Sequence, residues 1–224
     1  MTFAEITKHL AAWTPYLLTG FWWNIVVSLT AMVIGTVVGL LLAVMRDSSV
    51  RGAKSGGNVL TAAMHVAPTF VMLFYLTYMI PEQLEIFGLS VHVPVWLKAS
   101  LAFGIAVAGF VSDNALVSIR HFAKGHVLEA LLFLPSWTNY FLIIVMASST
   151  ASVIGVPEMV YRARTVIGAV DQIGFVFWAY LYVMMWFLVF SILLTMVMHL
   201  LCNRLTERSH GLLRQDETDL GGIP

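Results

Sequence analysis

Long apolar stretches separated by short polar segments are the dominant pattern along this chain of 224 residues. A helix of roughly 20 apolar residues crosses the ~30 Å hydrocarbon core of a bilayer, and these stretches reach that length. Five spans are expected, over residues 22–45, 58–80, 96–119, 130–154 and 175–202. The pattern therefore predicts an all-α, polytopic membrane bundle that occupies residues 17–205.

The segment before the first span is amphipathic. Its large apolar side chains recur at intervals of three and four, which places them on one helical face: Phe3, Ile6, Leu10, Trp13 and Leu17. We expect residues 1–16 to form a short helix lying in the membrane interface. The alternative is an extension of the first span, which Pro15 disfavours because proline interrupts a helix. At the other end, the polar and acidic residues 206–224 are expected to form a flexible cytoplasmic tail.

The distribution of Lys and Arg predicts the orientation, because cytoplasmic loops carry an excess of these residues. An odd number of spans places the two termini on opposite sides of the membrane. With the C-terminus inside, the cytoplasmic basic residues are Arg46, Arg51, Lys54, Arg120, Lys124, Arg204, Arg208 and Arg214. The outside then holds only Lys8, Lys98, Arg162 and Arg164. We therefore expect the N-terminus outside and the C-terminus in the cytoplasm.

The composition narrows the possible function classes. Apolar residues make up 59% of the chain and charged residues 11%, against roughly 25% charged residues in soluble domains. The net charge is zero, so no electrostatic case exists for nucleic acid. Cys202 is the only cysteine, and no second ligand lies at metal-site spacing from His65 or His199, so neither a metal nor another cofactor is expected. The sequence also lacks a phosphate-binding GxxxxGK[S/T] loop and a nucleophile–base set, so we do not expect an enzyme.

A stripe of small residues runs along the first span. It recurs at every fourth position and comprises Ala31, Gly35, Gly39 and Ala43. Small residues on one helix face let the backbone of another helix approach closely within a membrane. We therefore expect this face to pack against another helix and not against lipid.

Motif fragments in several parts of the chain resemble one family. The fragments are a GxWxNxxxS run from Gly20 to Ser28, LPSWTN at 134–139, Ser148 with Ser149, VIGVPE at 153–158, and the single residues Pro68, Pro81 and Arg120. In order and spacing they resemble the permease subunits of polar amino-acid ABC importers, over about residues 15–205. The resemblance implies a membrane subunit of a small-solute importer in a bacterial inner membrane. It also implies a second permease-like subunit, ATPase subunits and an extracytoplasmic solute-binding protein as partners.

Several positions depart from the pattern of that family. Its arginine, glutamine, glutamate and lysine are replaced, in that order, by His65, Met72, Val117 and Met146. The cytoplasmic loop from Arg120 through Gly125 to Glu129 lacks the segment that would form the ATPase-docking helix. An alternative function follows, in which a degenerate permease-like scaffold anchors or regulates a membrane complex without ATP-coupled transport.

Polar residues within the spans are candidates for a substrate path, because burying them in hydrocarbon is costly. The candidates are His65, Asp113, Asn139, Ser148 and Ser149. Asp113 either serves the path or sits at headgroup depth, and His65 is either a path residue or a packed helix residue. The two hydroxyls either line the path or bond to a carbonyl one turn earlier. Asn139 is harder to satisfy locally, because its amide carries two donors.

Overall fold

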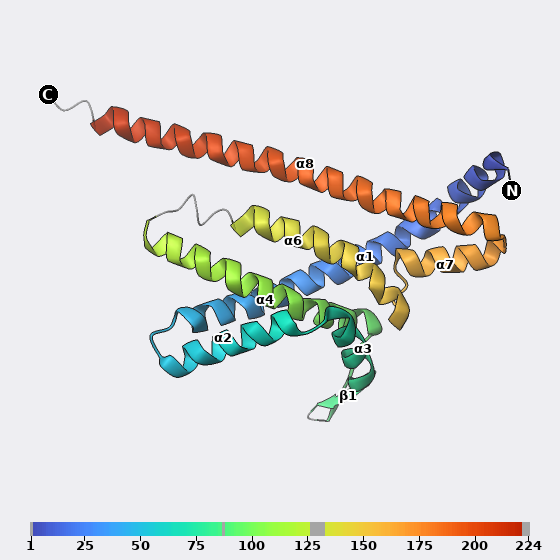
Figure 1. The fold of residues 1–224 in the computed structure, drawn as a ribbon, viewed down its shortest axis with the longest axis horizontal. Coiled ribbons are helices and arrows are strands. Elements are labelled where there is room, and N and C mark those ends of the chain that lie inside the picture. Colours follow the sequence, from blue (N-terminus) through green and yellow to red (C-terminus); the bar gives the residue numbers. More distant parts are fainter. Residues whose placement is uncertain (1, 87, 126–132, 221–224) are drawn as a thin grey trace.

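The computed structural model describes residues 2–86, 88–125 and 133–220, and Figure 1 shows its long helices and the small strands beside them. In chain order the elements are α1 (Phe3–Asp47), α2 (Arg51–Val66), α3 (Thr69–Met79), β1 (Gln83–Ile86), β2 (Leu89–His92), α4 (Val95–Ala123), α6 (Phe133–Ala147), the 3₁₀ helix η1 (Ser148–Ile154), α7 (Met159–Val170) and α8 (Ile173–Leu220).

Among these described elements, four helices are long and apolar enough to cross a membrane. They are α1, α4, α6 continued by η1, and the Ile173–Met198 part of α8. The pair α2 and α3 qualifies as a fifth span, although the two helices are bent by 98° relative to each other. The prediction of a helical membrane bundle with about five spans is confirmed.

The second span, expected over residues 58–80, is broken into two helices in the structure. Helix α2 ends at Val66, Ala67 adopts an extended backbone with φ −65° and ψ 113°, and α3 begins after Pro68. Proline lacks an N–H group and disfavours the helical conformation of the residue before it. The chain therefore leaves α2 at this point and starts α3 in a new direction.

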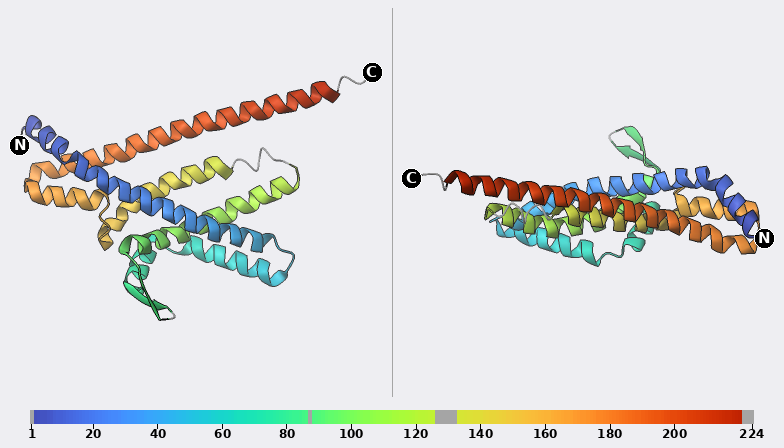
Figure 2. Two further views of the ribbon diagram at one scale, coloured as in Figure 1. Left: turned by 180° about the vertical axis from the view of Figure 1, so that it is seen from behind. Right: turned by 90° about the horizontal axis from the view of Figure 1, so that it is seen from above.

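The β1–β2 hairpin, which the sequence pattern did not predict, follows α3. Its antiparallel register pairs Leu84 with Val91 and Glu85 with Ser90, so apolar and polar residues alternate between its two faces. Both views of Figure 2 show the hairpin projecting away from the helices.

Helices α1 and α8 are longer than the spans that the sequence predicted. Helix α1 has 45 residues and continues through Pro15, so residues 1–16 do not form a separate helix. Proline is tolerated within membrane helices because neighbouring groups satisfy the freed backbone. Helix α8 has 48 residues, about 72 Å of helix, and extends to Leu220. The interfacial position of residues 1–16 and the flexibility of residues 206–224 stay predictions.

Helices α1 and α4 form the central pair of the bundle. The small residues Ala31, Gly35, Gly39 and Ala43 are all buried. A Cβ atom on Gly39 would lie 2.6 Å from the Cβ of Val111 and 2.7 Å from the carbonyl oxygen of Ala108, both in α4. The stripe therefore brings the two backbones into the close approach that is typical of small-residue contacts in membranes.

Helix α8 is largely uncovered by the rest of the chain. Only 6% of its most apolar window is buried, against 61% of the corresponding window in α4. Its first turns pack against α7 and the N-terminal part of α1 through Phe175, Ala179 and Val183. In all views its C-terminal end runs beyond the other helices (Figures 1 and 2). The remaining apolar surface is available for lipid or another subunit.

Candidate functional site

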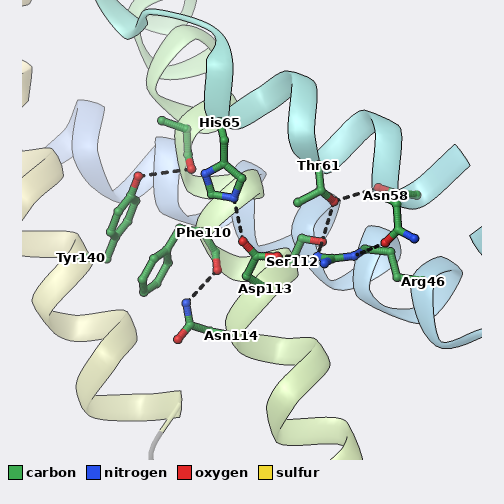
Figure 3. Close-up of polar contacts among 11 residues, drawn as sticks. Arg46, Asn58, Thr61, His65, Phe110, Ser112, Asp113, Asn114 and Tyr140 are labelled. Atoms are coloured by element: carbon green, nitrogen blue, oxygen red, sulfur yellow. Dashed lines mark hydrogen bonds and ion pairs between the residues drawn. The ribbon is translucent and has the colours of Figure 1, made fainter. Parts of the chain in front are cut away.

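Three ionisable side chains from three helices meet where α1 ends and α2 packs against α4. We call Arg46, His65 and Asp113 the charge cluster. Arg46 donates from Nη1 to Asp113 Oδ1 at 2.6 Å, and His65 Nε2 lies 2.7 Å from Asp113 Oδ2 (Figure 3). The carboxylate therefore joins the end of α1 to the end of α2 across α4.

Neutral polar groups extend the charge cluster along α2. Arg46 also donates to Ser112 Oγ at 2.9 Å and from Nε to Asn58 Oδ1 at 3.0 Å. The hydroxyls of Thr61 and Ser112 are 2.8 Å apart. On a helix, residues three or four positions apart share one face, so Asn58, Thr61 and His65 lie on one face of α2 and contact Arg46, Ser112 and Asp113, respectively. Arg46 is in the last turn of α1, where a cation complements the helix dipole.

A groove lined by several polar side chains lies between α4 and α6 beside Asp113. Its volume is about 440 Å³, and its lining comprises Asp113, Asn114, Val117, Ser118, His121, Phe133 and Ser136. The Asn114 amide donates to the Phe110 carbonyl at 2.9 Å, and the Ser118 hydroxyl donates to the Asn114 carbonyl at 3.0 Å. Five of the seven lining residues that the structure describes are of polar types, although both helices are candidate membrane spans.

The other polar residues of this groove were not among the residues predicted for the substrate path. Asn114, Ser118 and His121 are spaced by four and three positions, which places them on one face of α4. That periodicity was available in the sequence. The participation of Ser136 was not, because it depends on how α6 packs against α4.

A second, buried cluster lies between α1, η1 and the start of α7. We call Asn24, Ser148 and Glu158 the cap cluster; the three residues are at most 1% exposed. Asn24 donates from Nδ2 to Ser148 Oγ at 2.9 Å and to Glu158 Oε2 at 3.0 Å, and its Oδ1 accepts the Met159 N–H at 3.1 Å. Asn24 belongs to the first motif fragment, residues 20–28, and Glu158 to the last, residues 153–158. The fold brings these two distant fragments into direct contact.

Glu158 caps the N-terminus of α7 and lies outside the candidate spans. Its Oε1 accepts the Tyr161 N–H at 2.7 Å, and its Oε2 accepts the Val160 N–H at 3.0 Å. Burial raises the pKa of the Glu158 carboxyl above its usual value, while these N–H groups, the Asn24 amide and the charge of Arg164 oppose the shift. Such a capping carboxylate stabilises the helix start.

The structure divides the predicted path residues between different places. His65 and Asp113 meet in the charge cluster, whereas Ser148 is buried in the cap cluster. Ser149 donates to the Met146 carbonyl at 2.7 Å, which is the local bond expected of such a hydroxyl. Asn139 is exposed, makes no hydrogen bond to the described residues, and is not part of the groove lining.

The residues assigned to a residual coupling loop are described only in part. Arg120 donates from Nε to Asp47 Oδ1 at 3.1 Å, which links the ends of α4 and α1. Gly125 has a positive φ of 83°, a conformation that glycine adopts without strain. Glu129 lies outside the described residues. Across the described ranges, no group of His, Cys, Asp and Glu is arranged to hold a metal ion.

The fold as a whole is similar to that of a solved structure. A chain of the "Crystal structure of an amino acid ABC transporter with histidines" matches with a TM-score of 0.73 at 19% identity, covering 91% of this chain and 99% of that one. The fold is therefore that of a membrane subunit of an ABC transporter.

Curated proteins similar to this chain are permease proteins of amino-acid transport systems. The L-cystine transport system permease protein TcyB of Bacillus subtilis is 26% identical over 215 residues, covering 85% of this chain and 87% of the relative. The probable amino-acid ABC transporter permease protein YckA of the same organism is 22% identical over 174 residues, covering 69% and 74%. The glutamate/aspartate import permease protein GltK of Escherichia coli is 30% identical over 142 residues, covering 62% and 63%. No protein-family model matches the chain. The homologues of this chain are amino-acid ABC transporter permeases.

Proposed function

We propose that this chain is a membrane-spanning permease subunit of an amino-acid ABC importer in a bacterial inner membrane. The observation that carries the proposal is the homology to amino-acid ABC permeases, which in one relative extends over 85% of this chain. The subunit contributes part of a solute path, and a second permease-like subunit, ATPase subunits and an extracytoplasmic solute-binding protein complete the importer.

The position of the charged groups supports a path along α4. Ten residues, about 15 Å of helix, separate Asp113 from the end of α4 at Ala123. The side chains of Asp113 and His65 are 47% and 48% exposed on this chain. Intramembrane ionisable groups face a water-filled cavity or a bundle interior, because lipid exposure costs at least ~2.5–3.5 kcal/mol. This face of α2 and α4 is therefore suited to line an aqueous path or to meet another subunit.

The uncovered surface of α8 supports the requirement for partners. Its exposed apolar residues include Leu181, Leu188 and Leu193, and the same helix is among the most apolar of the candidate spans. Among the described residues, the groove between α4 and α6 is lined by residues of these two helices alone, so this subunit provides only part of an enclosing wall.

Affinity purification of the tagged chain from its native membrane, followed by identification of bound subunits, tests the proposal. We expect ATPase subunits and a second permease chain to co-purify, whereas an unrelated tagged membrane protein retains neither. Recovery of an unrelated complex without ATPase subunits contradicts the proposal and favours a scaffold role.

Substitutions at two asparagines, one inside the groove and one outside it, test whether the groove is the solute path. Asn114 lines the groove, and Asn139 lies outside its lining. In the purified complex reconstituted into proteoliposomes, Asn114→Leu is expected to lower solute uptake several-fold because it replaces a polar wall by an apolar one. Asn139→Leu is expected to leave uptake near the wild-type rate. Equal effects of the two substitutions, or a loss confined to Asn139→Leu, would rule out this groove as the path.

A further inference from the structure

We propose that the pair of His65 and Asp113 is an exchangeable proton-binding site within the membrane part of the chain, and that the bound proton holds α2 against α4. This inference goes beyond transport of a solute, and its test requires no partner subunit. It assigns a second bound species, a proton, to residues that otherwise belong only to a structural contact.

The geometry of the pair is that of a proton-sensitive contact. His65 Nε2 lies 2.7 Å from Asp113 Oδ2, and Arg46 occupies the other carboxylate oxygen at 2.6 Å. With a neutral imidazole, Arg46 already balances the Asp113 charge, and His65 adds an ordinary hydrogen bond. A protonated imidazole adds a charge-assisted hydrogen bond, which is roughly twice as strong. Histidine is the side chain whose charge changes within pH 5–8.

The location of His65 gives its protonation a structural consequence. His65 is in the last turn of α2, one residue before that helix ends at Val66, and α3 leaves at 98° after Pro68. A cation in the last turn also interacts favourably with the helix dipole. Both effects act in the same direction, so protonation strengthens α2 and its contact with α4 next to the break.

The imidazole lies against the backbone of α4. A Cβ atom on Gly109 would lie 3.4 Å from the His65 Cε1 and 3.5 Å from its Nε2. These are ordinary van der Waals distances, so the ring lies against this face of α4 while it reaches Asp113. The close approach couples the state of the ring to the spacing of the two helices.

The surrounding charged and titratable groups are few on each packed helix. Helix α1 contributes Arg46, and also Asp47, which pairs with Arg120 of α4. Helix α4 contributes Asp113 itself and His121, which lines the same groove. Helix α6 contributes Tyr140, whose hydroxyl donates to the Ala106 carbonyl at 3.2 Å (Figure 3).

The half-exposed His65 and the groove that Asp113 lines provide access for proton exchange. Asp113 lines this groove, and two other lining residues, Ser118 and His121, lie closer to the C-terminal end of α4. The sequence predicts that this end of α4 is cytoplasmic, so the proton is expected to exchange with the cytoplasm. A side chain with a permanent charge at position 65, such as arginine, would abolish the sensitivity while keeping the contact.

Distance measurements between spin labels on α2 and α4 test the proposal in the full chain, reconstituted in lipid nanodiscs. Val59 and Phe122, which are 65% and 64% exposed, are replaced by cysteine in a Cys202→Ser background. The wild-type pair is expected to give a short, narrow distance distribution at pH 5.5 and a longer, broader one at pH 8.5. The His65→Gln and Asp113→Asn variants are expected to lose this change with pH.

Two further variants separate proton binding at His65 from other causes. His65→Arg is expected to keep the short distribution at both pH values, because its charge is permanent. His92→Gln, which removes a histidine of the β1–β2 hairpin, is expected to behave as the wild type. A pH-independent wild type, or a pH-dependent change that persists in His65→Gln or His65→Arg, overturns the proposal.

Discussion

Glu158 is the residue whose environment is most unlike that of an exposed carboxylate. It is fully buried, and its partners are the Asn24 amide and two backbone N–H groups of α7. The sequence contained this glutamate in a motif fragment but could not link it to Asn24, 134 positions away. Hydrogen bonds at that separation depend on tertiary packing, so no local pattern predicts them.

The raised pKa of Glu158 predicts a pH dependence of stability. A carboxyl whose pKa is higher in the folded chain than in the unfolded one, where it is near 4.5, favours folding most below that value. Its contribution is lost as the pH rises through the folded-state pKa. We expect Glu158→Gln to remove this part of the decline in thermal unfolding temperature between pH 4 and 7, measured in detergent. The same decline in both proteins would show that Glu158 does not contribute to it.

Asn24 supplies a second prediction at this scale. Asn24→Leu removes three hydrogen bonds and leaves Ser148 and Glu158 without that partner. Leaving buried polar groups unsatisfied costs about 1–3 kcal/mol each, so we expect a clearly lower unfolding temperature. Ser149→Ala is the matched control, because Ser149 bonds only within its own helical turn. Similar unfolding temperatures for the two variants would contradict the role of the cap cluster.

At the scale of elements, the sequence predicted those features of the helices that depend on local periodicity, such as which face of a helix makes contacts. The four-residue spacing of Ala31, Gly35, Gly39 and Ala43 indicated a contact face, and this face lies against α4. The apolar pattern predicted the second span, but the break within it comes from Pro68, which ends α2, and the pattern of apolar residues did not reveal it. The groove was missed because part of its wall, Phe133 and Ser136, comes from α6.

Two glycines test the close packing of α1 on α4. A Cβ on Gly39 would lie within 2.8 Å of α4 atoms, whereas a Cβ on Gly56 in α2 meets no atom within 4 Å. Gly39→Ala is therefore expected to destabilise the chain by about 1–3 kcal/mol through overpacking. Gly56→Ala is expected to be neutral or to stabilise it by up to ~1 kcal/mol, because alanine favours helix. Thermal unfolding in detergent measures both, and a neutral Gly39→Ala would contradict the packing.

At the scale of the whole molecule, the chain has the fold of an amino-acid ABC transporter chain, and its sequence predicts a cytoplasmic loop that lacks the ATPase-docking helix. Helix α4 ends at Ala123 and α6 begins at Phe133, so nine residues connect them. An effector moves a conformational equilibrium only by contacting its states differently. A second permease subunit that retains a docking helix can supply that contact for the pair.

ATP-driven uptake in proteoliposomes tests the central claim most directly. The partner subunits that co-purify with this chain are reconstituted with ATP and a panel of labelled amino acids. One preparation contains this chain, and a second preparation omits it. We expect ATP-dependent uptake of at least one amino acid by the complete complex. We expect no uptake when this chain is omitted, and no solute-stimulated hydrolysis by this chain and the ATPase alone. Equal uptake without this chain, or no uptake of any amino acid by a complete complex that hydrolyses ATP, would contradict its role as a translocation subunit.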